Sequence, residues 1–102
     1  MLVKNIKDQN ILVTGAGGTI GAELVKQVAQ IGARKIVLVD HSEFSLYEIH
    51  EALLNLIPDD STVEVIPILA SILDYQHMDS IFLEWKPHSI FHSAAYKHVP
   101  IV

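Results

Sequence analysis

Thr14-Gly15-Ala16-Gly17-Gly18-Thr19-Ile20-Gly21 is a glycine-rich loop between two segments of different hydrophobic periodicity. The segment before it, 10–14, is a short apolar run of the kind expected for a buried parallel strand. The segment after it, 19–31, is expected to be a helix that ends at Gly32. The expected apolar face of this helix is Ile20, Leu24, Val28 and Ile31. A strand, a glycine loop and a helix in this order place unpaired backbone N–H groups at the positive end of a helix dipole, where an anion binds.

The spacing of the glycines indicates which anion binds. Glycines at 15, 18 and 21 permit a sharp turn, a close approach of the backbone to a pyrophosphate, and close packing of helix on sheet. The alternative phosphate-binding pattern, Gly-x-x-x-x-Gly-Lys-[Ser/Thr], is absent, because Ile20, Gly21 and Ala22 occupy its last three positions. A pyrophosphate therefore fits this loop, and its expected cofactor-binding residues are Gly15, Gly17, Gly18, Thr19, Ile20 and Gly21.

Alternating strand and helix signals continue along the chain. Strands are expected at 35–40, 62–69 and 89–92. Ser42 is expected to cap a second helix, and Ser71-Ile-Leu-Asp74 resembles the capping box of a third, which ends before Pro87. The second helix is expected to bury Leu46, Ile49, Leu53 and Leu56, and the third Met78, Ile81, Phe82 and Trp85.

This β-α-β-α-β-α-β pattern predicts an α/β fold, a Rossmann-like doubly wound parallel sheet with strand order 3-2-1-4. Pro67 supports the order independently, since a proline within a strand is tolerated mainly at a sheet edge. Residues 1–9 are expected to lead into a domain at 10–102. The strand at 89–92 would then have a bare outer edge, so we expect half of a larger fold that self-associates through that edge.

Asp40 closes the second strand nineteen residues after Gly21, where an acid accepts hydrogen bonds from the ribose hydroxyls of an adenosine. Its carboxylate would repel a 2′-phosphate, and neither Arg nor Lys follows within 41–44. The sequence thus predicts binding of NAD or NADP, with NAD favoured. Ser42 and a protonated His41 could still host the extra phosphate; alternatively Ser42 serves only as a helix cap.

Composition excludes several other functions. Seven Lys and Arg against twelve Asp and Glu give a net charge of −5, which disfavours nucleic-acid binding. The chain has no cysteine, and its six histidines lack metal-ligand spacing, so no metal site is expected. The sequence contains neither a membrane span, which needs about 18 apolar residues, nor an apolar signal core, so a cytoplasmic location is expected.

Three segments together resemble the CapD-type nucleotide-sugar 4,6-dehydratases of polysaccharide biosynthesis, in the extended short-chain dehydrogenase/reductase superfamily. They are the glycine loop, Asp40-His-Ser-Glu43 with Leu46-Tyr-Glu-Ile49, and His92-Ser-Ala-Ala-Tyr-Lys-His-Val-Pro100. The sequence departs from this family at Ser93, where alanine is usual, and at Ala70-Ser71, where Gly-Asp or Gly-Ser is frequent. The second departure puts in doubt an adenine contact by an acid at that point.

The resemblance implies a cofactor site and a reaction. Gly15, Gly18, Ile20 and Gly21 would lie along the cofactor pyrophosphate, and residues 40–42 at the adenosine ribose. Ser93, Ala94 and Ala95 would lie near the nicotinamide, and Lys97 would reach toward the sugar nucleotide or the cofactor. Members of the family oxidise C4 of a UDP-N-acetylhexosamine with bound NAD(P)⁺, eliminate water across C5 and C6, and return the hydride to C6. By the same resemblance the partners are a UDP-sugar and further copies of the protein, and some similar proteins carry a membrane-anchored region.

Catalytic residues are not expected within these 102 residues. The tyrosines at 47, 75 and 96 are followed four residues later by Glu51, Asp79 and Pro100, so no Tyr-x-x-x-Lys pair is present. Two alternatives therefore stay open. One is a related sugar-nucleotide epimerase or reductase with the same glycine loop, and the other is a non-catalytic domain that senses a dinucleotide.

Overall fold

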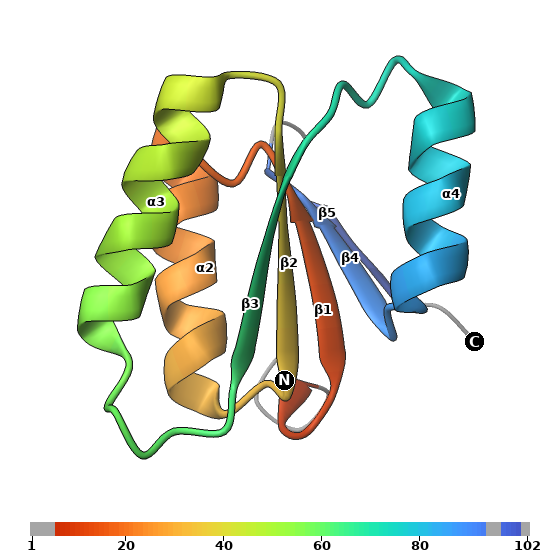
Figure 1. The fold of residues 1–102 in the computed structure, drawn as a ribbon. Helices are drawn as coiled ribbons and strands as arrows, with labels where there is room; N and C mark the ends of the chain where they lie inside the picture. Colours follow the sequence, from red (N-terminus) through yellow and green to blue (C-terminus); the bar gives the residue numbers. More distant parts are fainter. Residues whose placement is uncertain (1–5, 94–96, 101–102) are drawn as a thin grey trace.

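The computed structural model describes residues 6–93 and 97–100. Strands and helices alternate along it: β1 (Asn10–Thr14), α2 (Thr19–Ile31), β2 (Lys35–Asp40), α3 (Glu43–Leu56), β3 (Glu64–Leu69), α4 (Tyr75–Trp85), β4 (Ser89–His92) and β5 (Lys97–Pro100). The sheet order is β3-β2-β1-β4-β5, and β1 to β4 are parallel. The predicted Rossmann-like fold and its 3-2-1-4 order are confirmed (Figure 1).

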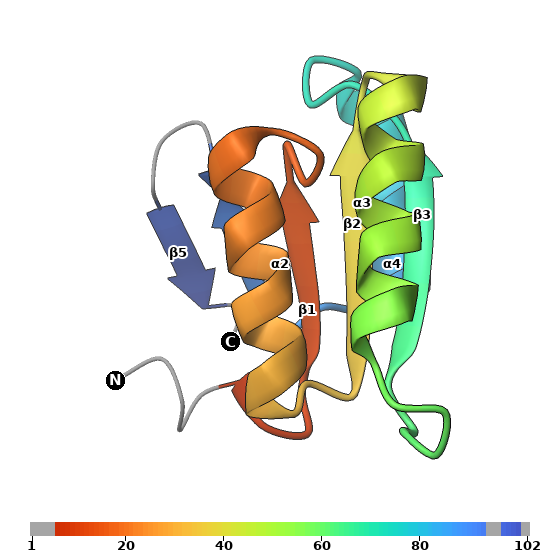
Figure 2. The same cartoon turned by 90° about the vertical axis from the view of Figure 1, so that its left-hand side faces the viewer.

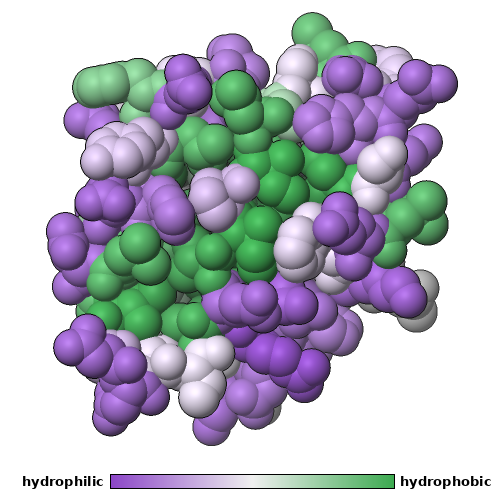
Figure 3. Space-filling model, in the orientation of Figure 1, coloured by the Kyte–Doolittle hydropathy of each residue, from purple (hydrophilic) through white to green (hydrophobic). Residues whose placement is uncertain are grey.

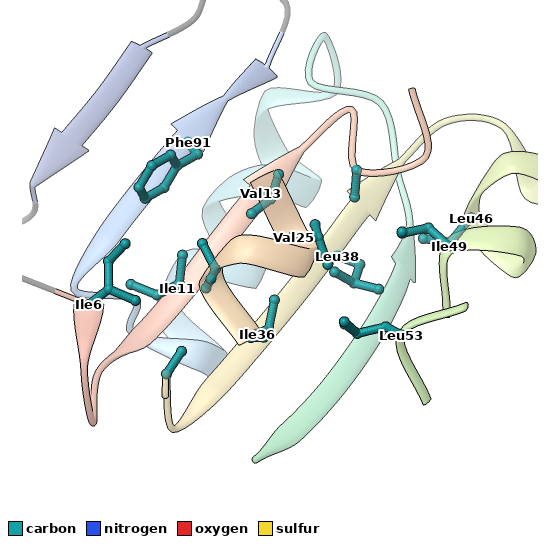
Figure 4. Packing of buried hydrophobic residues seen from close by; sticks show 13 residues of the cluster. Ile6, Ile11, Val13, Val25, Ile36, Leu38, Leu46, Ile49, Leu53 and Phe91 are labelled. Carbon is teal, nitrogen blue, oxygen red and sulfur yellow. The ribbon is translucent and has the colours of Figure 1, made fainter. Parts of the chain in front are cut away.

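The helices cover both faces of the sheet. Alternate side chains of β1 and β2 divide between two apolar clusters, as the period of two in a strand requires. Ile11 and Val13 face α2 and α3, whereas Leu12 belongs to the cluster beneath α4. Figure 2 shows α2 and α3 side by side over one face, and Figure 4 shows the buried aliphatic side chains between them and the sheet. Parallel strands buried on both faces are nearly continuously apolar, which explains the sequence of β2.

The buried faces of two helices differ from the prediction. In α2 the buried residues are Gly21, Val25 and Val28, while Leu24 is only partly buried against the same cluster. The prediction for α3 holds for Leu46, Ile49 and Leu53 and is wrong for Leu56, which is 42% exposed. Leu56 is the last residue of the helix, and the backbone becomes extended at the next residue, Ile57.

The cap of α4 also differs from the prediction. Asp74 caps the helix by accepting a hydrogen bond from the backbone N–H of His77, whereas Ser71 accepts one from Leu73 in the preceding turn. Met78 and Ile81 are buried as expected, with Phe82 and Trp85 partly buried beside them in the same cluster.

β3 lies at the edge of the sheet, and Pro67 occupies a position in it where the backbone nitrogen points away from β2. The backbone N–H groups of Glu64 and Ala70 donate to the carbonyls of Arg34 and Asp40 in the direction of β2. The N–H groups of the even-numbered residues between them therefore also point toward β2. An N–H at position 67 would point away from the sheet, which explains why a proline fits this strand. In Figure 3 a band of apolar side chains crosses the face where Figure 1 shows β3. Within β3, Pro67 and Leu69 are exposed.

The bare edge expected for β4 is not observed. β5 pairs with β4 in antiparallel fashion, with Ser89 opposite Pro100 and His92 opposite Lys97. Residues 97–100 thus supply the missing strand neighbour, because a strand with unpaired N–H and C=O groups favours such a pairing. Self-association through the edge of β4 is therefore not supported.

The described part of the lead-in packs on the domain. Ile6 is fully buried in the cluster beneath α2, and the backbone carbonyl of Gln9 accepts hydrogen bonds from Arg34 and Lys35. No helix within residues 6–93 is both long enough and apolar enough to cross a membrane.

Candidate functional site

A cavity of about 360 Å³ lies at the carboxyl ends of the parallel strands. Its walls come from the ends of β1 and β2 and from the loops that follow all four parallel strands: Thr14, Gly15, Val39, Asp40, His41, Ala70, Ser71, Ile72, Leu73 and Ser93. In open α/β sheets, ligands bind at this edge, beside the point where the strand order reverses. Here that point lies between β1 and β4.

The glycine loop runs from β1 into α2 beside this cavity. Gly15 has a φ of +64°, a left-handed conformation that a residue with a Cβ adopts only with strain. Its carbonyl accepts a hydrogen bond from Gly18 N at 3.0 Å, which closes the turn, and Ala16 N donates to Val39 O at 3.1 Å. The loop is thus tied both to itself and to β2.

Two of the glycines are required by close contacts. A Cβ on Gly21 would collide with the carbonyl of Gly15, so the first turn of α2 lies directly against the loop. A Cβ on Gly17 would stand 2.6 Å from backbone atoms of Ser45 in α3. Gly18, in contrast, has only Gly15 O at 3.4 Å from such an atom, an ordinary contact.

The N-terminus of α2 has free donors. Gly18 is the N-cap and supplies no side-chain hydrogen bond, and the first turn contains no acidic residue. The first helical hydrogen bond runs from Ala22 N to Gly18 O at 2.8 Å, so the N–H groups of Thr19, Ile20 and Gly21 precede the helical pattern. These groups and the helix dipole together suit a phosphate.

Asp40 lies at the end of β2, directly against the glycine loop. Its side chain is 6% exposed, and both carboxylate oxygens accept backbone hydrogen bonds: Oδ2 from Gly17 N at 2.8 Å and Oδ1 from Ser42 N at 2.9 Å. Each carboxylate oxygen has a second lone pair, so the group retains capacity to accept from a ribose hydroxyl.

His41 and Ser42, predicted at the same ribose, have different surroundings. His41 is 84% exposed at the rim of the cavity, with Nδ1 3.9 Å from Oδ1 of Asp40. Ser42 is the N-cap of α3, because its Oγ accepts from Ser45 N at 3.3 Å and lies 3.2 Å from Ser45 Oγ. The structure thus gives Ser42 the capping role, and it does not line the cavity.

The end of β4 contributes polar groups to the other side. Ser93 is 7% exposed, and its hydroxyl donates to Gly15 O at 3.3 Å, so it occupies the space beside the left-handed glycine. Thr14 Oγ1 lies 3.1 Å from Nδ1 of His92. Lys97 lies in β5 opposite His92, whereas Ala94 and Ala95, predicted near the nicotinamide, fall outside the described residues.

Sequence reasoning reached one wall of the cavity only in part, since it connected Ala70-Ser71 with an adenine contact through the family resemblance and missed Ile72 and Leu73. Ala70, Ser71, Ile72 and Leu73 follow β3, and Leu73 is 76% exposed although it is apolar. An exposed apolar loop beside Asp40 suits the flat face of a purine base. The available signal was positional, since this loop leaves the same edge of the sheet as the glycine loop.

Comparison with known proteins places the chain in a family. The family described as "Polysaccharide biosynthesis protein" matches residues 11–102. The chain belongs to this family. It is 35% identical over 102 residues to the capsular polysaccharide biosynthesis protein CapD of Staphylococcus aureus, and 35% identical over 100 residues to the probable polysaccharide biosynthesis protein EpsC of Bacillus subtilis. The resemblance to CapD-type proteins is thereby confirmed.

The chain corresponds to a small part of these relatives. The CapD alignment includes 100% of this chain and 17% of CapD, and the EpsC alignment 95% of this chain and 16% of EpsC. Among solved structures, an NAD⁺-bound xylitol dehydrogenase superposes with a TM-score of 0.63 over 79% of this chain and 30% of its own, at 22% identity. At that identity the likeness concerns the fold.

Proposed function

We propose that the chain is the dinucleotide-binding part of an NAD(P)-dependent enzyme that modifies a sugar nucleotide for polysaccharide biosynthesis. The observation that carries the proposal is the position of Asp40 beside the free N-terminus of α2, at the carboxyl edge of the sheet. Phosphate-binding amides and a ribose-binding acid are the two groups that a dinucleotide requires. Family membership supports the setting in polysaccharide biosynthesis.

Each part of the site has a role in this proposal. The first-turn amides of α2 hold the pyrophosphate, Asp40 accepts from the adenosine ribose, and the loop 70–73 covers the adenine. Ser93 borders the nicotinamide side. NAD is preferred to NADP because a 2′-phosphate would lie beside the buried carboxylate of Asp40.

We further propose that the reaction is 4,6-dehydration of a UDP-N-acetylhexosamine. When bound, the dinucleotide supplies the acceptor of a hydride from C4 and its later donor to C6. The residues of this chain orient it, while the acid and base lie outside these 102 residues, since no Tyr-x-x-x-Lys pair is present. Lys97 is proposed to contact the sugar nucleotide.

Parallel fluorescence titrations with NADH and NADPH test the binding proposal. We expect NADH to bind more tightly than NADPH, and Asp40→Asn to weaken NADH binding about tenfold, as for loss of a hydrogen bond to a charged group. Asp59→Asn, which removes the same charge from the turn before β3, should leave binding unchanged. Equal affinities of the two nucleotides would contradict the role of Asp40, and absence of binding would contradict the proposed function of this chain.

The reaction is tested on a protein of the relatives' length that contains this chain, incubated with UDP-N-acetylglucosamine. Dehydration lowers the mass of the sugar nucleotide by one water, which mass spectrometry detects. A C4 epimer of unchanged mass would instead identify a related epimerase and overturn the dehydratase proposal.

A further inference from the structure

The carboxylate of Asp40 bridges two backbone segments that border the candidate site. One is the glycine loop, through Gly17 N at 2.8 Å, and the other is the start of α3, through Ser42 N at 2.9 Å. Both distances are those of charge-assisted hydrogen bonds. The side chain is 6% exposed, so water competes little for these bonds.

The same two segments also touch each other. The Cα of Gly17 lies so close to Ser45 that an added Cβ would be 2.6 Å from its backbone carbon and oxygen. Gly17 is thus fixed on one side by the body of α3 and on the other by Asp40. Beyond Gly17, the chain continues directly through Gly18 to the first-turn amides of α2. The orientation of Gly17 therefore sets the path of the chain into the phosphate-binding turn.

We propose that Asp40 is a positioning residue for the anion-binding loop, in addition to any contact with ribose. It holds Gly17 against α3 before a ligand arrives, so that the free amides of α2 already point at the phosphate position. The proposal rests on the dinucleotide-binding function proposed above. Such preorganisation strengthens binding because the loop does not have to be ordered when the ligand binds.

Asparagine at position 40 cannot perform this role. Its side chain has one acceptor oxygen and one donor NH₂ group. Whichever way the amide is turned, one of the two backbone N–H groups, at Gly17 or Ser42, faces another donor. Asp40→Asn therefore breaks the hydrogen-bonded bridge between the loop and the start of α3, with almost no change in side-chain volume.

The wild-type chain without ligand provides the first test. Amide hydrogen exchange measured by NMR should be slow at Gly17 and Ser42, which donate to Asp40, and at least tenfold faster at Ile20, which precedes the helical hydrogen bonds. Exchange at Gly17 as fast as at Ile20 would overturn the proposal without any variant.

The second test uses inorganic pyrophosphate, a ligand with no ribose. If Asp40 acted only through ribose hydroxyls, Asp40→Asn would leave pyrophosphate binding unchanged. A positioning role predicts that the variant weakens it about tenfold and speeds exchange at Gly17 or Ser42, while amides in the middle of β1 stay protected. Asp59→Asn should change neither quantity.

The outcomes separate this inference from the proposed function. Unchanged pyrophosphate binding in a folded Asp40→Asn variant overturns the positioning role and leaves dinucleotide binding standing. If neither pyrophosphate nor NADH binds the wild-type chain, the proposed function fails, and wild-type exchange at Gly17 and Ser42 still decides whether Asp40 holds the loop. If Asp40→Asn does not fold, the same wild-type exchange measurement decides.

Discussion

At the scale of single residues, the glycines of the loop have different reasons to be there. Gly15 requires its left-handed φ of +64°, and Gly21 lies against the carbonyl of Gly15. Gly18 has neither constraint, because its conformation is extended and its nearest contact is ordinary. A pattern of glycines in a sequence predicts the loop, but only the contacts show which glycine is indispensable.

This difference leads to a paired prediction. Gly21→Ala should lower the free energy of unfolding by about 1–3 kcal/mol, because the methyl group forces α2 away from the loop. Gly18→Ala should lower it by about 1 kcal/mol or less, the effect of a poorer N-cap. Urea denaturation of both variants measures this. Equal losses would show that the packing of α2 on Gly15 is not as close as described.

The sequence also predicted the position of Asp40 but not its bonds. An acid at the end of the second strand indicates a ribose contact by position alone. That its oxygens already accept from Gly17 and Ser42 depends on how two loops meet, which neither periodicity nor motif spacing reveals. For the same reason, the contact between Ser93 and Gly15, 78 residues apart, could not be predicted.

At the scale of elements, the first and last residues of most helices and strands were predictable, because glycines and prolines mark where helices begin and end. The glycine loop, Gly32 and Pro87 delimit helices, and β1, β2 and β4 were expected where they occur. Which face of α2 packs on the sheet was not predictable, because apolar residues lie on more than one side of this helix. Its orientation is fixed by the close approach of Gly21 to Gly15, so the face with Gly21, Val25 and Val28 is buried.

The edge strand yields a prediction of its own. Pro67 removes an outward N–H from an otherwise apolar strand edge, which opposes pairing with the edge of another molecule. Pro67→Val should therefore promote concentration-dependent self-association. Sedimentation velocity over a range of protein concentrations measures this, with Pro58→Val, in the turn after α3, as the control. A Pro67→Val variant that associates no more than the control would contradict the protective role.

At the scale of the whole molecule, the handedness of the crossovers accounts for what could be predicted. Right-handed connections place α2 and α3 on one face and α4 on the other, and they bring four strand ends to one cavity. The pairing of β5 was not predicted, because the strand at 89–92 was expected to have a bare outer edge and residues 97–100 have no local strand signal. Ile72 and Leu73 in the cavity wall were missed because they belong to no motif.

The central claim is that this cavity and the adjoining loop bind a dinucleotide, and NMR mapping of NAD⁺ on the ¹⁵N-labelled chain tests it most directly. We expect backbone shifts to change at 15–21, 40–42, 70–73 and 93, and not at Asp79 and Phe82, which line a second cavity of about 360 Å³ between α4 and β4 that shares Ile72 with the first. Changes confined to that second cavity, or no changes at saturating NAD⁺, would contradict the account.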